Sequence, residues 1–225
     1  MAELRRHGDW VGAGERETAE FLRDALPDDW IIDSNLQLPT NNHEDIDLLI
    51  TGRNKLFVVE IKNWGPTIVL DTHYWRVVGH GKSPDGGDSR RSPLPLLAQK
   101  AKTAKSIISQ AVAKGEPIHK QRLVEGLLIL SRKGVSLRGS CPGDEDVLTP
   151  EQALWVLQEM DKEKKTDLAK HRDTVSQVIS GLPARSSDVS KLGDYIVKKA
   201  LGDLGITKRY EAEHSMAGEP VILYC

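Results

Sequence analysis

The sequence predicts an α/β fold in which helices flank a mixed β-sheet. Three observations support this: an amphipathic helix over 15–26, a β-hairpin over 44–64, and an apolar strand over 123–131 that follows a second helix at 96–114. Apolar residues spaced three and four apart are typical of a helix packed on a core. Short β-branched runs bounded by Gly, Pro and Asn are typical of strands.

The composition indicates a globular chain. The 225 residues are 39% hydrophobic and 28% charged, with a net charge of -2, which is ordinary for a soluble domain. No apolar run approaches the roughly 20 residues that cross a bilayer, and the polar N-terminus is unlike a signal peptide. Cys141 and Cys225 form neither a disulfide framework nor a metal-binding spacing. We therefore expect a cytoplasmic protein without a membrane partner.

The first helix is preceded by residues 1–14, which are predicted to form a polar lead-in loop or a short helix. Extending the buried stripe of the helix backwards reaches Glu15, the one acid of this helix on the core side. Glu15 is either a functional acid directed toward the sheet or a first-turn glutamate favoured by the helix dipole. The stripe itself comprises Ala19, Leu22 and Leu26.

The hairpin brings two acids together. A turn at 52–55 sets Asp47 opposite Glu60, and directly opposed residues have Cβ atoms roughly 5 Å apart. Lys62 shares the face of Glu60 because strand side chains alternate. The other face then carries the apolar residues Leu48, Ile50, Phe57, Val59 and Ile61.

Opposed carboxylates repel each other, so this pair requires a compensating cation. Lys62 can supply the charge, but a divalent metal is the more productive candidate because carboxylate oxygens suit Mg²⁺. A lysine beside the metal can position or deprotonate an attacking water. The alternative is that Asp47 and Glu60 are solvated at strand ends and that Lys62 only pairs with one of them.

The order of Asp47 and then Glu60-Ile61-Lys62 resembles the Asp…Glu-x-Lys signature of the PD-(D/E)xK nuclease superfamily. Together with Gly14-Glu15, Leu26-Pro27, Trp75, Pro95 and Gln99, residues 1–140 resemble its nuclease-related domain (NERD) branch. The resemblance implies a restriction-endonuclease-like core and a metal-dependent deoxyribonuclease that uses Mg²⁺ or Mn²⁺. The substrate implied is DNA, with RNA as the alternative.

The resemblance also implies roles for single residues. Asp47 and Glu60 would hold the metal together with the main-chain carbonyl of Ile61. Lys62 would orient the hydroxide, and Glu15 would support this lysine or a second metal. Gln99 would steer the phosphate, although residues 92–99 are looser than the family's Asn-Pro to Gln spacing. The implied catalytic residues are thus Glu15, Asp47, Glu60, Lys62 and Gln99.

Between the hairpin and the second helix, short strands are predicted at 67–70 and 74–78, followed by a loop over 79–92 that is mobile until substrate binds. Basic residues outnumber acidic ones in this loop and the next helix, which indicates either phosphate binding or a solvated helix face. We place Lys100 on the flank of the polar helix face. The nucleic-acid-binding candidates are Lys82, Arg90, Arg91 and Lys102. Three aromatic residues either stack on bases or pack in the core: Trp64, Tyr74 and Trp75.

A helical extension is predicted over 141–182, where a capping box at 149–152 opens one helix and a second follows at 166–179. Residues 183–193 read as a Ser-rich linker. Residues 194–225 resemble the opening strands of a kinase-like N-lobe, with a degraded Gly-rich loop, so these residues alone have no kinase activity.

Nuclease-related domains joined to kinase-like domains occur in bacterial proteins, including kinases of phage defence. The resemblance therefore implies an attached kinase-like domain and defence-system proteins as partners. The leading hypothesis is a metal-dependent nuclease acting on DNA. The alternative is a non-catalytic module that binds nucleic acid and regulates the attached kinase-like domain.

Overall fold

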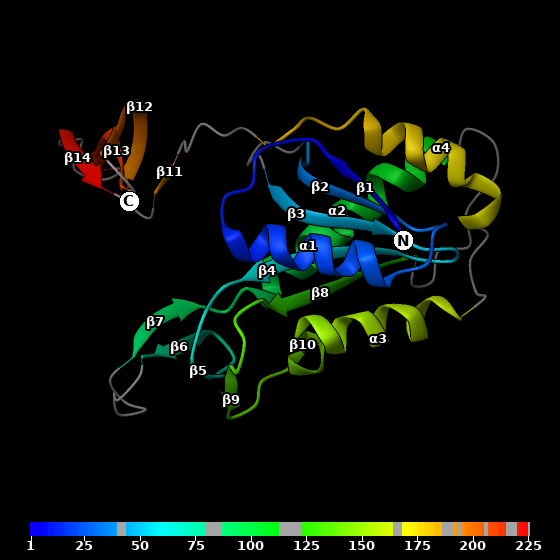
Figure 1. Cartoon of the computed structure of the whole chain (residues 1–225), viewed down its shortest axis with the longest axis horizontal. Coiled ribbons are helices and arrows are strands. Elements are labelled where there is room, and N and C mark those ends of the chain that lie inside the picture. The colour runs from blue at the N-terminus through cyan, green and yellow to red at the C-terminus, as the bar shows by residue number, and fades with distance from the viewer. Residues whose placement is uncertain are drawn as a thin grey trace. The chain divides into compact units, whose positions relative to one another are not determined.

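The computed structural model divides into two compact units, Met1–Arg185 and Ser186–Cys225 (Figure 1). The residues that the structure describes are 1–39, 44–79, 87–112, 123–163, 168–185, 191–192, 195–204, 207–214 and 220–224.

The first unit is built on a six-stranded mixed sheet. Its strands are β1 (Glu3–Arg6), β2 (Ile31–Gln37), β3 (Asp45–Thr51), β4 (Leu56–Lys62), β8 (Val124–Leu130) and β10 (Val147–Leu148). The strand order is β1-β2-β3-β4-β8-β10. The β2–β3 and β3–β4 pairs are antiparallel, whereas β1–β2, β4–β8 and β8–β10 are parallel. The predicted α/β class with a mixed central sheet is confirmed.

Helices cover both faces of this sheet. They are α1 (Ala13–Ala25), α2 (Leu94–Val112), α3 (Pro150–Asp161) and α4 (Leu168–Ser180). One apolar cluster joins α1 and α3 to one face of the central strands, and a second cluster joins α2 and α4 to the other. In Figure 1, α1 crosses in front of the central strands and α2 lies behind them. The predicted capping box is present, since Thr149 and Gln152 exchange hydrogen bonds at the start of α3.

The β3–β4 hairpin has the register expected from a turn at 52–55, with Thr51 paired to Leu56 and Leu48 paired to Val59. The predicted apolar face is also confirmed, because Leu48, Ile50, Phe57, Val59 and Ile61 all belong to the cluster beneath α1 and α3. Lys62, two residues beyond Glu60, is the last residue of β4.

The hairpin turn is held by the end of α3. The carboxylate of Asp161 accepts main-chain N–H groups from Arg53, Asn54 and Lys55 at 2.8–2.9 Å. A Cβ atom on Gly52 would lie 2.5 Å from an oxygen of Asp161. This contact requires glycine at that position and ties the register of the hairpin to the helical segment.

A second, smaller sheet contains β5 (Thr67–Val69), β6 (Tyr74–Val78), β7 (Asp88–Arg91) and β9 (Ser136–Arg138), in the order β7-β6-β5-β9. The loop prediction was wrong for 88–91, because Arg90 pairs with Trp75 across β6 and β7. Trp75 is fully buried in the core, so its packing role holds, while Tyr74 is exposed. Lys82 lies outside the described residues.

The N-terminal prediction also needs correction. Residues 3–6 form a strand that pairs with residues 31–34 rather than a loop or short helix. Four residues of which three are charged carry little strand signal alone, and their pairing depends on the neighbouring strand. Among the residues that the structure describes, no helix is long and apolar enough to cross a membrane.

The second unit is a four-stranded antiparallel sheet. Its strands are β11 (Lys191–Leu192), β12 (Tyr195–Leu204), β13 (Thr207–His214) and β14 (Pro220–Tyr224), in sequence order. This agrees with the short β-rich tail expected from the sequence.

Candidate functional site

Asp47 and Glu60 lie where β3 and β4 separate. Regular pairing ends at Leu48 and Val59. One residue further along, Oδ2 of Asp47 accepts the main-chain N–H of Ile61 at 2.7 Å, so a side chain replaces the next backbone partner. Asp47 and Glu60 are only 3% and 8% exposed. The structure therefore brings the two predicted acids together and removes them from water.

Two lysines hold the carboxylate of Glu60. Nζ of Lys62 donates to Oε1 at 2.6 Å, and Nζ of Lys100 donates to Oε2 at 2.6 Å. Burial favours the neutral acid, but the two ammonium groups outweigh it and lower the pKa of Glu60 below its ordinary value. Glu60 is thus an ionised carboxylate with a cation at each oxygen.

Lys100 was placed on the wrong side of α2 by the sequence analysis. It is buried rather than on the flank of a polar face. The sequence does contain a signal for this burial, because Lys100 lies three residues after Leu97 and four before Ala104, both on the buried stripe of α2. A charged residue on such a stripe requires a buried partner, which is Glu60.

The environment of Asp47 disfavours a bare negative charge. Burial, together with repulsion from Glu60 and Glu15, raises the pKa of Asp47 to about 7. Lys62 and the N–H of Ile61 offset part of this rise. A carboxylate in this setting gains from a nearby cation, since positive charge restores the ionised form.

Arg185 supplies such a cation, which sequence reasoning missed. Its Nη1 lies 2.9 Å from Oδ1 of Asp47 and 3.6 Å from Oε1 of Glu15. Its Nε lies 3.2 Å from Oδ2 of Asp45. Arg185 falls in the segment predicted as linker, and no local pattern relates it to Asp47, which lies 138 residues earlier in the chain.

Glu15 reaches the site through Arg185. Its other oxygen, Oε2, accepts the main-chain N–H of Val11 at 3.2 Å. Glu15 also stands in the first turn of α1, whose N-cap residue Gly12 offers no side-chain cap. The two alternatives left open by the sequence therefore coexist: this acid supports the helix start and also faces the cluster.

Gln99 lies on α2 beside Lys100, and its Nε2 donates to Oε1 of Glu44 at 2.7 Å. Among the described contacts, the side chain of Gln99 therefore binds Glu44, which precedes β3, and not Asp47 or Glu60. Its predicted action on phosphate stays a prediction.

The basic candidates divide between two places. The Arg90 guanidinium lies 5.1 Å from the ring centroid of Trp64, and Nζ of Lys62 lies 6.0 Å from the same ring. Arg90 and the site lysine thus share one aromatic neighbour. Arg91 is exposed beside it on β7.

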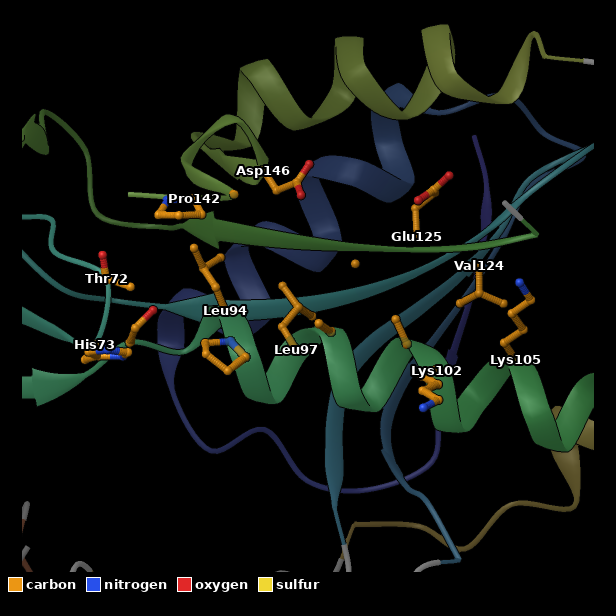
Figure 2. Close-up of a pocket in the computed structure, with 16 residues that line it drawn as sticks. Thr72, His73, Leu94, Leu97, Lys102, Lys105, Val124, Glu125, Pro142 and Asp146 are labelled. Atoms are coloured by element: carbon orange, nitrogen blue, oxygen red, sulfur yellow. The ribbon is translucent and has the colours of Figure 1, made fainter. Parts of the chain in front are cut away.

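Lys102 lines a different feature, a cavity of about 670 Å³ between α2 and β8. Figure 2 shows Lys102 and Lys105 of α2 on one side of this cavity and Glu125 of β8 on the other. Much of the remaining lining is apolar, including Leu94 and Leu97. The cavity does not include Asp47 or Glu60.

The acid pair suits one mode of metal binding. Within the described ranges, no group of three or more His, Cys, Asp or Glu side chains is arranged to hold a metal ion. Mg²⁺ commonly binds through one or two carboxylates and completes its shell with waters and substrate oxygens. Asp47 and Glu60 supply the two buried carboxylates of this mode, and Ile61, whose N–H binds Asp47, is the residue whose main-chain carbonyl could join them.

Comparisons with known proteins identify the family of this chain. The nuclease-related domain family matches residues 11–131. The chain is also 26% identical over 226 residues to "Probable kinase PglW" of Streptomyces coelicolor, a match that covers 93% of this chain but 14% of that protein. No solved structure gave a significant match. Since the family match spans more than half of the sequence, the chain belongs to the nuclease-related domain family.

Proposed function

We propose that the first unit is a metal-dependent nuclease that hydrolyses DNA phosphodiester bonds. The observation that carries this proposal is the buried pair Asp47 and Glu60, with Nζ of Lys62 2.6 Å from Glu60. Two acids can hold a divalent ion, and a neighbouring lysine can position the attacking water or the phosphate, which together suit metal-assisted phosphodiester hydrolysis. Membership of the nuclease-related family is consistent with this chemistry.

Asp47, Glu60 and the main-chain carbonyl of Ile61 would hold Mg²⁺ or Mn²⁺. When bound, such an ion lowers the pKa of a coordinated water and neutralises charge on a phosphate. The two lysines of Glu60 have different roles, because the side chain of Lys62 is 27% exposed and that of Lys100 is 6% exposed. Lys62 can reach a water or a phosphate, whereas Lys100 positions Glu60.

Arg90 would bind the DNA backbone near this site. It lies over the ring of Trp64, which Lys62 also contacts, and it belongs to the exposed strand β7. Arginine and lysine contacts to phosphate provide the salt-dependent part of DNA binding. We assign Arg91 and Lys102 to the same sequence-independent role.

We further propose that this unit works within a larger, cytoplasmic, kinase-containing defence protein. The similar protein from Streptomyces coelicolor is named a probable kinase, and this chain spans 14% of its length. The β-rich tail would then be the start of the kinase-like part.

A cleavage assay tests the nuclease proposal. Linear, nicked and single-stranded DNA, and single-stranded RNA, are incubated with Mg²⁺ or Mn²⁺ and the wild-type chain, Lys62→Ala or Lys162→Ala. Lys162 is an exposed lysine at the end of α3 and serves as the matched control. We expect Lys62→Ala to reduce cleavage by about 100-fold or more and Lys162→Ala to leave it unchanged. Equal cleavage by wild type and Lys62→Ala would show that this site is not the catalyst.

One observation favours a non-catalytic module as the second candidate. The oxygens of Asp47 and Glu60 already contact Lys62, Lys100, Arg185 and one amide, so the cluster is compensated without a metal. If the wild-type chain binds DNA but cleaves none of the four substrates with either metal, the regulatory function is favoured. Loss of cleavage with retained DNA binding in Asp47→Asn would exclude it.

A further inference from the structure

We propose that Arg185 is a removable counter-ion that occupies the place of the metal, so that the site takes up a divalent cation when residues 183–185 are displaced. This proposal rests on the metal site proposed above and adds a way to regulate metal binding there. Residues 183–185 are called the strap, and the release of Arg185 with the strap is called the latch.

The guanidinium of Arg185 reaches three acids at once. It lies within 2.9–3.6 Å of oxygens of Asp45, Asp47 and Glu15. It binds Oδ1 of Asp47, and Oδ2 is held by the N–H of Ile61. Oδ1 is therefore the oxygen through which Asp47 would ligate a metal. Arginine and metal compete for the same atom.

The charges of the cluster also indicate that Arg185 and a metal ion replace each other. Four acids, Glu15, Asp45, Asp47 and Glu60, face the three cations Lys62, Lys100 and Arg185. With all of them ionised, the cluster carries one net negative charge. Exchange of Arg185 for a divalent ion makes it neutral, whereas binding both leaves an excess positive charge in a buried site. Exchange is therefore favoured over joint occupancy.

The strap is attached to the sheet by few bonds. The N–H of Gln37 donates to the carbonyl of Pro183 at 2.9 Å, and the N–H of Arg185 donates to the carbonyl of Asn35 at 2.7 Å. Ala184 and Leu36 form an isolated antiparallel bridge. The strap thus extends the sheet beyond the end of β1, which pairs with β2 only as far as Ser34.

These main-chain bonds hold the strap weakly, and its stronger attachment is the ion pairing of Arg185, whose charge an incoming divalent ion would replace. A main-chain hydrogen bond contributes only about 1 kcal/mol net. The chain also passes directly from Arg185 into the second unit, which begins at Ser186. A force or a conformational change transmitted from the second unit would therefore act first on the strap.

Gly8 provides a way to move the strap without changing any charge. A Cβ atom at this position would lie 2.9 Å from the main-chain oxygen of Arg185 and 3.3 Å from Asn35. Because the first contact is with backbone, Gly8→Ala shifts the strap. We expect it to loosen the contact of Arg185 with the acids while the acids, Lys62 and Lys100 are left unchanged.

The test is a Mn²⁺ titration of the 225-residue chain, with free Mn²⁺ measured by its electron paramagnetic resonance signal. Wild type is compared with Arg185→Gln, Gly8→Ala and the control Arg53→Gln, which removes an exposed arginine paired with Asp29. We expect Arg185→Gln to tighten Mn²⁺ binding at least tenfold and Gly8→Ala to shift it in the same direction. Arg53→Gln should leave it unchanged, and adding Asp47→Asn to Arg185→Gln should abolish it.

Unchanged Mn²⁺ affinity in folded Arg185→Gln and Gly8→Ala would overturn the latch. Cleavage by wild type would then still support the nuclease. Absence of Mn²⁺ binding in every variant, or binding that survives Asp47→Asn, would overturn both proposals. If Arg185→Gln does not fold, as circular dichroism would show, Gly8→Ala decides the question because it retains all charges.

Discussion

The stability of Asp47→Asn relative to wild type should rise with pH in the metal-free protein. Asp47 is 3% exposed, and burial with two neighbouring acids raises its pKa from 3.8 to about 7. Because the folded-state pKa lies above the unfolded one, the folded chain holds an extra proton between these values. The contribution of Asp47 to stability is therefore full below about pH 4 and is lost as the pH rises through 7.

The magnitude follows from the size of the shift. One pKa unit corresponds to about 1.4 kcal/mol, so a rise of about three units corresponds to roughly 4 kcal/mol at pH 8. Asn cannot ionise, so the variant does not lose stability at this position as the pH rises. Its single side-chain oxygen can still accept the N–H of Ile61, and its NH₂ group replaces the oxygen that faces Arg185, a change that is the same at every pH. The advantage of Asp47→Asn over wild type should grow by roughly 4 kcal/mol between pH 4 and pH 8.

Urea denaturation in EDTA at each pH unit measures this difference. Asp173→Asn, on the exposed side of α4, is the matched control and should track wild type at every pH. A stability difference between Asp47→Asn and wild type that stays constant from pH 4 to pH 8 would refute the reasoning. Mg²⁺ should narrow the difference at high pH, because it stabilises only the protein that binds it.

Three further changes probe the supporting residues. Lys100→Met should lower the free energy of unfolding, measured by urea denaturation, by about 3–5 kcal/mol, because it removes one of two cations from buried Glu60. A decrease below about 1 kcal/mol would contradict a buried ion pair. Arg90→Ala should reduce the slope of the logarithm of the DNA-binding constant against the logarithm of the salt concentration by about one. An unchanged slope would show that Arg90 does not contact a phosphate. Asp161→Ala should cost roughly 3 kcal/mol because three hairpin amides lose their acceptor, yet the folded fraction should keep its cleavage rate. A lost rate would instead connect the turn to the site.

The register of the β3–β4 hairpin could be predicted because it depends on neighbouring residues alone. A four-residue turn and a side-chain period of two determine which residues oppose each other and which face they share. The apolar face beneath α1 and the meeting of Asp47 with Glu60 follow from those two facts.

The strands β1 and β7 could not be predicted in the same way. Each has four mostly polar residues, and each becomes a strand through pairing with β2 or β6. A short edge segment carries little intrinsic preference, since strand propensity reflects packing against neighbours. Whether such a segment forms a strand depends on the position of its partner strand.

The sequence by itself determined the helices, the central hairpin and the acid pair with its lysine, because periodicity, capping and turn chemistry act over a few residues. The tertiary structure alone decided which cations complete the cluster. Lys100 comes from a helix forty residues away from Glu60, and Arg185 comes from a segment 138 residues beyond Asp47. Buried carboxylates require compensating charge wherever the chain can deliver it. The identity of the residue that delivers it depends on packing between distant segments, which no local pattern records.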